Sequence, residues 1–396
     1  MFANSININI SLPKIKGPPK LGYPSYDHEM KILNPSIILA PKNTCKKCKY
    51  IVSARIDPLH QCDDKSPLFT YRKRTQPNAW FKGTAIILYD EQFNVLKWTW
   101  ILNDPSYQIH IKPSISRWGV PIGVCNDYLP PWSKGIYDTR LFMHKNYIYM
   151  TYNCKSCDFS ISQLNLDIKE KDGVVQEFRC WSLVRHKYNI KSIQGRNQAL
   201  FVNRNNMYLQ SWIGKIETFG KIKHRIVKKD CTIRTNKNIN ICGIYPNGTK
   251  NVVTNVLKSG IYSHVFKNHS LIDKLRQNYK FNKRISTTCH LVKIKNGFLG
   301  IGHYHRRNGH NNVKKRYAFG SEYEHFWYIL ENVYPFKMKR VSNSFCINNC
   351  DPIQFLSGLA VNKNNNKIIV SYGVNDCVSK IVTFNIDDVY LSTYTI

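Results

Sequence analysis

Apolar and polar residues alternate in five separate parts of the chain, each time as two short runs joined by a polar turn. In the clearest copy, YDTRLFMHKNYIYMTY at 137–152, His144, Lys145 and Asn146 separate the two runs. Strand side chains point to alternate faces, so each copy predicts a β-hairpin. The other four are NPSIIL with YIVSAR (34–55), RNQALFV with MYLQSW (196–212), RISTT and HLVK with FLGIGH (284–303), and QFLSGLAV with IIVSYG (354–373).

Repeated units that open with polar residues and continue as a hairpin are typical of propeller blades. Five such units in 396 residues leave enough chain for four strands per blade, and their uneven spacing indicates long insertions. The sequence therefore predicts an all-β fold, a five-bladed β-propeller, with residues 31–396 as one domain. Residues 1–30, which include Pro13, Pro18, Pro19 and Pro24, predict an irregular N-terminal arm.

Composition supports a folded chain with 42% hydrophobic and 13% aromatic residues. We find no signal-peptide pattern and no apolar run long enough to cross a bilayer, which favours a cytoplasmic location. Thirteen cysteines include two Cys-x-x-Cys pairs, Cys45 with Cys48 and Cys154 with Cys157, which lie too far apart in sequence for a zinc ribbon. We interpret them as half-buried thiols in a reducing compartment, and we expect no metal site and no cofactor.

The formal net charge of +33 indicates affinity for a polyanion. The excess is greatest from residue 215 to residue 340, with 26 Lys and Arg against 6 Asp and Glu. No helix-turn-helix or RNA-recognition signature accompanies this basic region. Two interpretations follow: the 215–340 region contacts a polyanion, or it is a solvated surface that reflects a Lys- and Asn-rich composition.

Candidate chemistry begins with Asp138 and Arg140, which are two residues apart and so project from the same face of a strand. General acid catalysis of a substitution needs a carboxylic acid and a second group that activates or replaces the nucleophile. Asp138 is the candidate acid and Asp376 the candidate second carboxylate. Arg140 favours the ionised form of Asp138, so an acid role requires burial or opposing contacts. The alternatives are a structural ion pair for Asp138 and a turn cap for Asp376.

Further polar and aromatic residues stand at the starts and ends of the five units, where a propeller would bring them to its axis. We predict that they bind the substrate: Asn34, Arg55, Arg140, Asn197, Arg284, His303, Tyr323 and His325.

These opening motifs resemble those of the five-bladed propeller glycoside phosphorylases and hydrolases that act on β-mannosides. Asn34-Pro35 with Arg55 is similar to that family's first-blade motif. Tyr137-Asp138-Thr139-Arg140 is similar to the second, Glu-Asp-Pro-Arg, whose Asp is the proton donor. The third-, fourth- and fifth-blade motifs are matched by Arg196-Asn197, by Ser286-Thr287-Thr288 with Gly302-His303, and by Tyr372-Gly373-Val374-Asn375-Asp376.

The resemblance implies a carbohydrate or sugar-phosphate substrate in an axial pocket, and glycosyl transfer, phosphorolysis or hydrolysis with Asp138 as acid. Tyr137 and Thr139 replace the family's acidic residue and proline, and Ser211 to Gly214 stand where its phosphorylases carry a basic phosphate ligand. Propellers that accompany glycosyltransferases are also similar. Two further hypotheses stay open: a glycan-binding propeller without catalysis, and a basic structural or nucleic-acid-associated scaffold.

Overall fold

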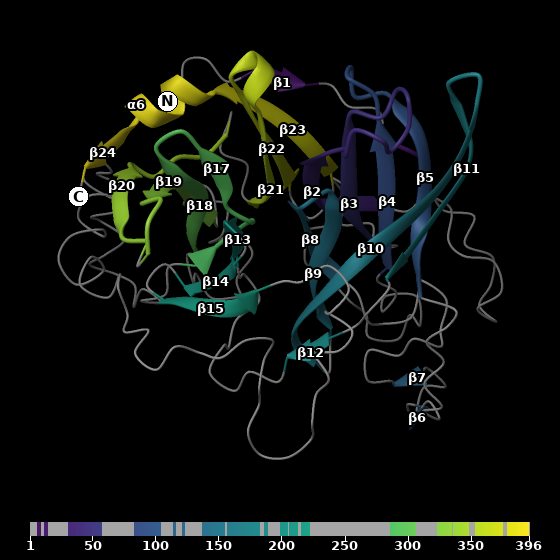
Figure 1. The fold of residues 1–396 in the computed structure, drawn as a ribbon, viewed down its shortest axis with the longest axis horizontal. Coiled ribbons are helices and arrows are strands. Elements are labelled where there is room, and N and C mark those ends of the chain that lie inside the picture. The colour runs from purple at the N-terminus through teal and green to yellow at the C-terminus, as the bar shows by residue number, and fades with distance from the viewer. Residues whose placement is uncertain are drawn as a thin grey trace, which may run out of the picture.

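The structure is a computed structural model in which the strands surround a common centre (Figure 1). It describes residues 6–8, 12–14, 31–57, 83–103, 114–115, 121–122, 137–154, 157–182, 186–188, 199–204, 206–212, 215–221, 286–305, 323–334, 336–347, 353–374 and 378–395.

The described strands form five antiparallel groups in chain order, which we call blades one to five. Blade one contains β2 (Lys31–Leu39), β3 (Tyr50–Asp57), β4 (Gly83–Tyr89) and β5 (Val95–Asn103), and blade two contains β8 (Tyr137–His144), β9 (Tyr147–Cys154), β10 (Cys157–Lys171) and β11 (Val174–Ser182). Blade three contains β13 (Ala199–Asn203), β14 (Asn206–Trp212) and β15 (Lys215–Lys221).

Blade four contains β16 (Ser286–Thr287), β17 (Val292–Ile294), β18 (Gly297–His305), β19 (Tyr323–Leu330) and β20 (Met338–Ser342), and blade five contains β21 (Gln354–Asn362), β22 (Lys367–Val374) and β23 (Val378–Asn385). Smaller elements are β6 (Ser114–Ile115), β7 (Pro121–Ile122), β12 (His186–Tyr188), the 3-10 turn η2 (Lys363–Asn365) and helix α6 (Ile386–Leu391).

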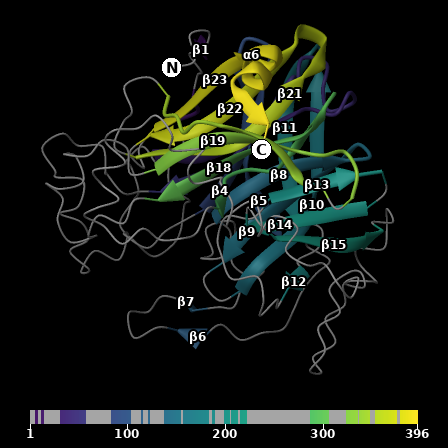
Figure 2. The same cartoon turned by 90° about the vertical axis from the view of Figure 1, so that its left-hand side faces the viewer.

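The blades are arranged radially, so the fold is an all-β propeller, as the repeated hairpins predicted. In Figure 1 the first strands of the blades, such as β2, β8 and β21, lie near the centre, and β5 and β11 lie at the outside. Seen from the side, β23, β18 and β14 lie one below another (Figure 2). All five predicted hairpins are antiparallel pairs: β2 with β3, β8 with β9, β13 with β14, β17 with β18, and β21 with β22.

The ring closes where blade five meets blade one. The hydroxyls of Ser357 and Ser371 both donate to the carbonyl oxygen of Pro35, each over 2.6 Å. A Cβ at Gly358 would lie 2.5 Å from the backbone nitrogen of Ile37, so only glycine allows this approach of the two strands. Small residues therefore let the last blade pack directly on the first.

Blades one and two form one continuous sheet. The outer strand β5 pairs in parallel with the outer strand β11, with Ile101 opposite Cys180 and Asn103 opposite Ser182. Inside this joined pair, Ile51, Ile86, Leu141 and other buried residues form a shared apolar cluster. Hydrogen bonds as well as side-chain packing hold these two blades together.

Both ends of the described chain add strands to late blades. β1 (Ile6–Ile8) pairs antiparallel with β23 in blade five, and β24 (Thr393–Thr395) pairs antiparallel with β20 in blade four. Blade five therefore combines strands from the beginning and the end of the sequence, which ties the N-terminal segment to the ring.

The expectation of free thiols is wrong for the first Cys-x-x-Cys pair, because Cys45 and Cys48 form a disulfide in the turn between β2 and β3. Cys180 and Cys289 are free and buried. In the part of the chain that the structure describes, no helix has the length and apolar character that crossing a membrane would require.

Candidate functional site

Two strained bulges place polar side chains at the start of the inner strands of blades one and two. The pairing of β2 with β3 shifts between Leu33 and Ser36, and that of β8 with β9 shifts between Tyr137 and Arg140. Within these bulges Asn34 and Asp138 adopt positive φ angles of 46° and 52°. Asn and Asp tolerate this conformation best among residues with a side chain, and such strain is concentrated at functional sites.

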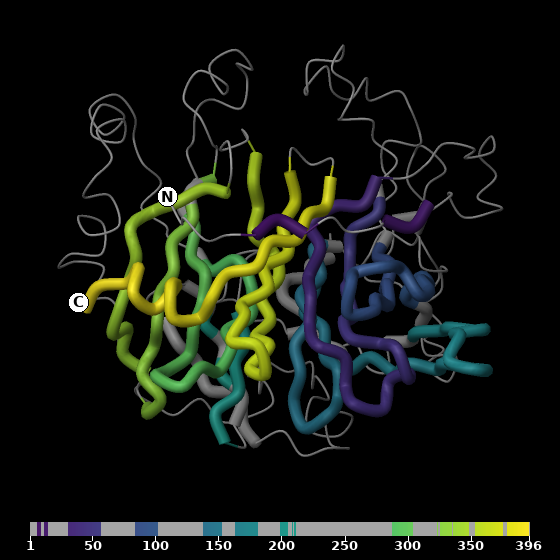
Figure 3. The backbone as a smooth tube through the Cα atoms, turned by 90° about the horizontal axis from the view of Figure 1, so that it is seen from above, coloured from purple at the N-terminus to yellow at the C-terminus, as the bar shows by residue number. Residues whose placement is uncertain are grey.

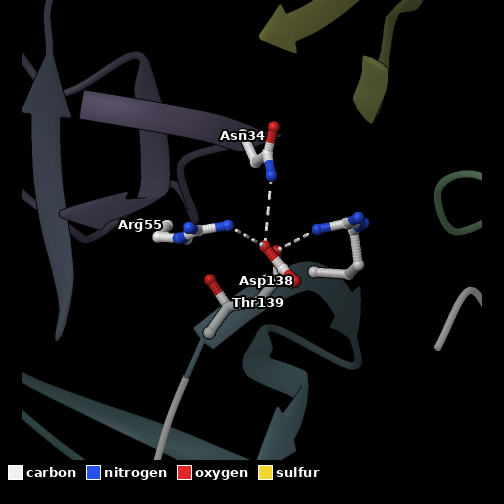
Figure 4. A network of polar contacts seen from close by, with 5 residues as sticks. Asn34, Arg55, Asp138 and Thr139 are labelled. Carbon is white, nitrogen blue, oxygen red and sulfur yellow. Dashed lines mark hydrogen bonds and ion pairs between the residues drawn. The ribbon is translucent and has the colours of Figure 1, made fainter. Parts of the chain in front are cut away.

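The two bulges meet through the carboxylate of Asp138 (Figure 4). Asn34 Nδ2 donates to Asp138 Oδ1 over 3.1 Å, and the Arg55 guanidinium lies 3.6 Å from the same oxygen. The side chain of Asp138 is 18% exposed and that of Arg55 is 12% exposed. The neighbouring Thr139 hydroxyl donates to Ser53 Oγ over 2.8 Å, which fixes the backbone that carries Asp138. The carboxylate is thus held in place and still reaches solvent.

Arg140 extends the cluster across the ring toward blades four and five. Its Nε donates to the Thr288 carbonyl over 2.9 Å, and its guanidinium carbon lies 5.4 Å from the ring centroid of Phe355. Burial lowers the pKa of Arg140, and the charge of Asp138 opposes that shift. Arg140 therefore links the carboxylate to the aromatic side of the site.

Four rings from blades four and five form that aromatic side. Phe355 packs edge-on against His303 and Tyr323, with ring centroids 5.4 Å apart in each pair, and His303 lies 6.2 Å from His325. Burial and the neighbouring His303 hold the pKa of His325 well below its usual range, so His325 is neutral at physiological pH. The half-buried rings of Phe355 and Tyr323 suit the apolar face of a sugar.

Seven of the predicted site residues therefore form one contiguous group, namely Asn34, Arg55, Asp138, Arg140, His303, Tyr323 and His325. Contacts through Phe355 and Arg140 join its two halves. Asn197, Arg284 and Asp376 lie outside the described residues, as does most of the basic stretch within 215–340. The roles of all ten side chains stay predictions.

The Tyr372-Gly373 pair of blade five requires glycine at its second position. A Cβ at Gly373 would lie 2.7 Å from Asn34 Oδ1 and 3.2 Å from the Asn34 backbone nitrogen. Any side chain here would push Asn34 away from Asp138. The glycine thus supports the site although it has no polar group of its own.

His290 and Phe355 are part of this arrangement, and the sequence did not single them out. Leu200 N–H donates to His290 Nδ1 over 2.8 Å, which leaves the proton on Nε2, and Nε2 lies 3.0 Å from the Arg140 carbonyl oxygen. Burial lowers the pKa of His290 to about 3. One imidazole thus connects blades two, three and four. No local pattern could reveal this, because its partners are 90 and 150 residues away.

The arrangement offers the partly exposed carboxylate of Asp138, the Arg55 guanidinium, the Asn34 amide and the half-buried rings of Tyr323 and Phe355, whereas Arg140 is buried. Such a set can donate hydrogen bonds to hydroxyl groups and accept hydrogen bonds from them. Among the described residues, no group of three or more His, Cys, Asp or Glu side chains could hold a metal ion.

No family model matches the sequence, and no curated protein matches it. Solved structures of similar fold include the β-1,2-mannobiose phosphorylase of Listeria innocua in complex with β-1,2-mannobiose, at 11% identity over 95% of this chain and 94% of that chain, with a TM-score of 0.46. A glycosyl hydrolase from Bacteroides ovatus is 10% identical over 90% of this chain and 85% of that chain, with a TM-score of 0.41. Trypanosoma rangeli sialidase with sialic acid is 10% identical over 98% of this chain and 60% of that chain, with a TM-score of 0.43. At these values the likeness concerns the general course of the chain and says nothing about activity.

Proposed function

We propose that this chain is a carbohydrate-active propeller that binds a glycoside at its axis and transfers the glycosyl group to water, phosphate or a hydroxyl, with Asp138 as the acid. The observation that carries the proposal is the Asp138 carboxylate, which stands on a strained bulge, is 18% exposed, and is oriented by Asn34 and Arg55. Glycoside chemistry requires such a positioned carboxyl group near the leaving oxygen.

The surrounding residues fit a sugar in two ways. Arg55 and Asn34 supply donors beside the carboxylate, and the half-buried Phe355 and Tyr323 supply ring surface on the other side of Arg140. A sugar ring has a hydroxylated edge and an apolar face. Polar groups on one side of a site and an apolar wall on the other can therefore orient it. This supports the substrate class without specifying the sugar.

The test compares the wild-type chain with its Asp138→Asn variant on a panel of mannosides and activated sugar donors, with and without phosphate, with products identified by mass spectrometry. General acid catalysis contributes about 10²- to 10⁴-fold, so the variant should lose at least about 100-fold in rate. Asp172→Asn is the matched control, because Asp172 is exposed in a turn and has the same φ of 52°. Equal rates for the wild type and the Asp138 variant would exclude an acid role.

The second candidate function is glycan binding without catalysis. It is favoured by the 3.6 Å contact between Arg55 and Asp138, because a neighbouring guanidinium favours the ionised carboxylate, which accepts hydrogen bonds from sugar hydroxyls and does not donate a proton. This candidate predicts no product from any donor, together with retention of the chain on a mannoside matrix that Asp138→Ala abolishes and Asp172→Ala does not. Lack of both product and retention would leave the basic scaffold hypothesis.

A further inference from the structure

A cavity lies among the inner strands, toward the opposite end of the propeller axis from Asp138. Its volume is about 270 Å³, and each blade contributes to its lining through the later part of its first hairpin strand or the residues beside it. The lining includes Ile38, Leu141, Phe201, Val292 and Val361. The lining residue nearest to Asp138 on the same strand is Leu141, three residues further along, which is about 10 Å in an extended strand. Asp138 and its partners Asn34 and Arg55 do not line the cavity, and His290 stands between the two regions because it lines the cavity and contacts the Arg140 carbonyl.

The wall of this cavity is apolar. Both ring nitrogens of His290, which also lines it, already have partners in the Leu200 amide and the Arg140 carbonyl. His290 is uncharged because burial lowers its pKa to about 3. Burying an apolar group against this wall therefore costs less desolvation free energy than burying a polar or charged group.

Basic residues stand in the hairpin turns at this end of the inner strands. The turns that end the five inner hairpins span residues 40–49, 144–147, 203–206, 294–297 and 362–367, and each contains at least one exposed Lys or Arg and no Asp or Glu. One exposed basic residue from each turn, in blade order, is Lys42, Lys145, Arg204, Lys295 and Lys363. Figure 3 shows purple, teal and yellow hairpin ends together at the lower side of the ring.

The described acidic residues near these turns belong to outer strands, outer turns and helix α6. Asp90 and Glu91 stand between β4 and β5, where Glu91 lies 3.6 Å from Lys49, and Asp172 stands in the turn between β10 and β11. Glu170, near the end of β10, accepts from the Lys46 backbone amide, and Asp387 in α6 accepts from the Asn366 side chain. Glu331 follows β19. Positive charge is thus concentrated near the axis and negative charge farther out, so the potential at the cavity mouth favours an anion.

Lys293 and Lys363 both line the cavity and connect its apolar wall to this basic rim. The Lys293 ammonium donates to Asn332 Oδ1 and lies 4.3 Å from the ring centroid of Phe298. Partial burial and the charge of Lys363 lower the pKa of Lys293. The two ammonium groups repel one another, and an anion between them would relieve that repulsion.

We propose that this cavity binds a small amphipathic anion, a molecule with an apolar group of roughly ten non-hydrogen atoms and one carboxylate or phosphate. A cavity of about 150 Å³ accommodates benzene, so 270 Å³ leaves room for a longer tail. The tail lies between the five inner hairpin strands, and the anionic group lies between Lys293 and Lys363 at the mouth.

The experiment is isothermal titration calorimetry of the full chain with octanoate, with octanamide as the uncharged analogue and acetate as the anion without a tail. Octanoate should bind at least about tenfold more tightly than either. The Lys293→Gln, Lys363→Gln double variant should weaken octanoate about tenfold or more and leave octanamide unchanged. Val361→Phe, which fills the cavity, should abolish binding of both. Lys380→Gln, an exposed change on β23, is the control and should alter neither.

Thermal unfolding of each variant, compared with the wild type, shows whether the cavity-filling change still folds. Octanoate affinity that is insensitive to the double variant, or equal to that of acetate, would overturn the proposal. A different result would also overturn it: no octanoate binding, together with binding of heparin or anionic vesicles that the lysine changes abolish. The basic rim would then bind a polyanion. These readouts measure binding, so they stand independently of glycoside turnover.

Discussion

At the scale of single residues, His290 couples the packing of three blades to pH. Its ring accepts from Leu200 N–H in blade three and lies within hydrogen-bonding distance of the Arg140 carbonyl and the Thr151 hydroxyl in blade two. Because burial lowers its pKa from 6.5 to about 3, the folded chain keeps this histidine neutral where the unfolded chain protonates it. Stability therefore falls as pH drops below about 6.5.

We expect the free energy of unfolding to decrease by up to about 1.4 kcal/mol per pH unit between pH 6 and pH 4 from this residue alone. His290→Gln keeps a side chain that can donate and accept but removes the titration, so the decrease with pH should be shallower by that amount. Urea unfolding at several pH values measures both slopes. Burial shifts the pKa of His325 in the same direction, so only the difference between the two proteins isolates His290. Parallel slopes would contradict the assignment.

Some features of the candidate site follow from the local sequence, and others do not. That Asn34, Arg55, Asp138 and Arg140 lie near one another could be expected from sequence, because each stands beside a hairpin. The alternation of two residues does not set the directions of Asp138 and Arg140, because the pairing of β8 with β9 shifts between Tyr137 and Arg140. The positive φ of Asn34 and Asp138 could not be expected either, since the side-chain contacts at the bulges join residues 86 and 104 positions apart. The Cys45–Cys48 disulfide was missed because a Cys-x-x-Cys spacing fits a thiol pair and a disulfide equally well.

At the scale of elements, the hairpins were predictable from local alternation, whereas the strands contributed by the chain ends were not. β24 joins β20 some fifty residues away in sequence, and Arg340 secures the pairing. Its Nε donates to Thr393 Oγ1 over 2.8 Å, its guanidinium also donates to the Thr393 carbonyl, and it lies 4.4 Å from the ring centroid of Tyr390. A single side chain therefore fixes both the helix α6 and the last strand.

Arg340→Lys should destabilise the chain by about 1–2 kcal/mol, because lysine keeps the charge but cannot donate in the same forked geometry. Chemical unfolding measures the loss, and amide hydrogen exchange of residues 393–395 should rise before that of β20. The control is Lys339→Gln, an exposed neighbour on the same strand, which should be neutral within about 0.5 kcal/mol. Unchanged exchange in the last strand would contradict this role.

At the scale of the whole molecule, 58 basic residues against 25 acidic ones leave a large net repulsion in the compact state. Salt screens this repulsion, because the Debye length falls from about 10 Å at 0.1 M to about 3 Å at 1 M. We expect the thermal midpoint of unfolding to rise with sodium chloride over this range, by roughly 2 °C or more. Differential scanning calorimetry measures it, and a midpoint that falls with salt would show that attractive ion pairs dominate.

The pairing of β5 with β11 distinguishes the joint between blades one and two. Paired backbone strands join these two blades, whereas individual hydrogen bonds join blade five to blade one, through Ser357 and Ser371, and blade four to blade three, through Leu291 and Leu200. Local opening should therefore favour the joints without paired strands. Asn34 and Arg55 belong to blade one and Asp138 to blade two, the two blades that this pairing unites. We therefore expect the carboxylate cluster to stay assembled in local openings that displace His303 and Tyr323. For the proposed glycoside site, this predicts that ligand entry requires movement of the aromatic residues and leaves the polar cluster in place.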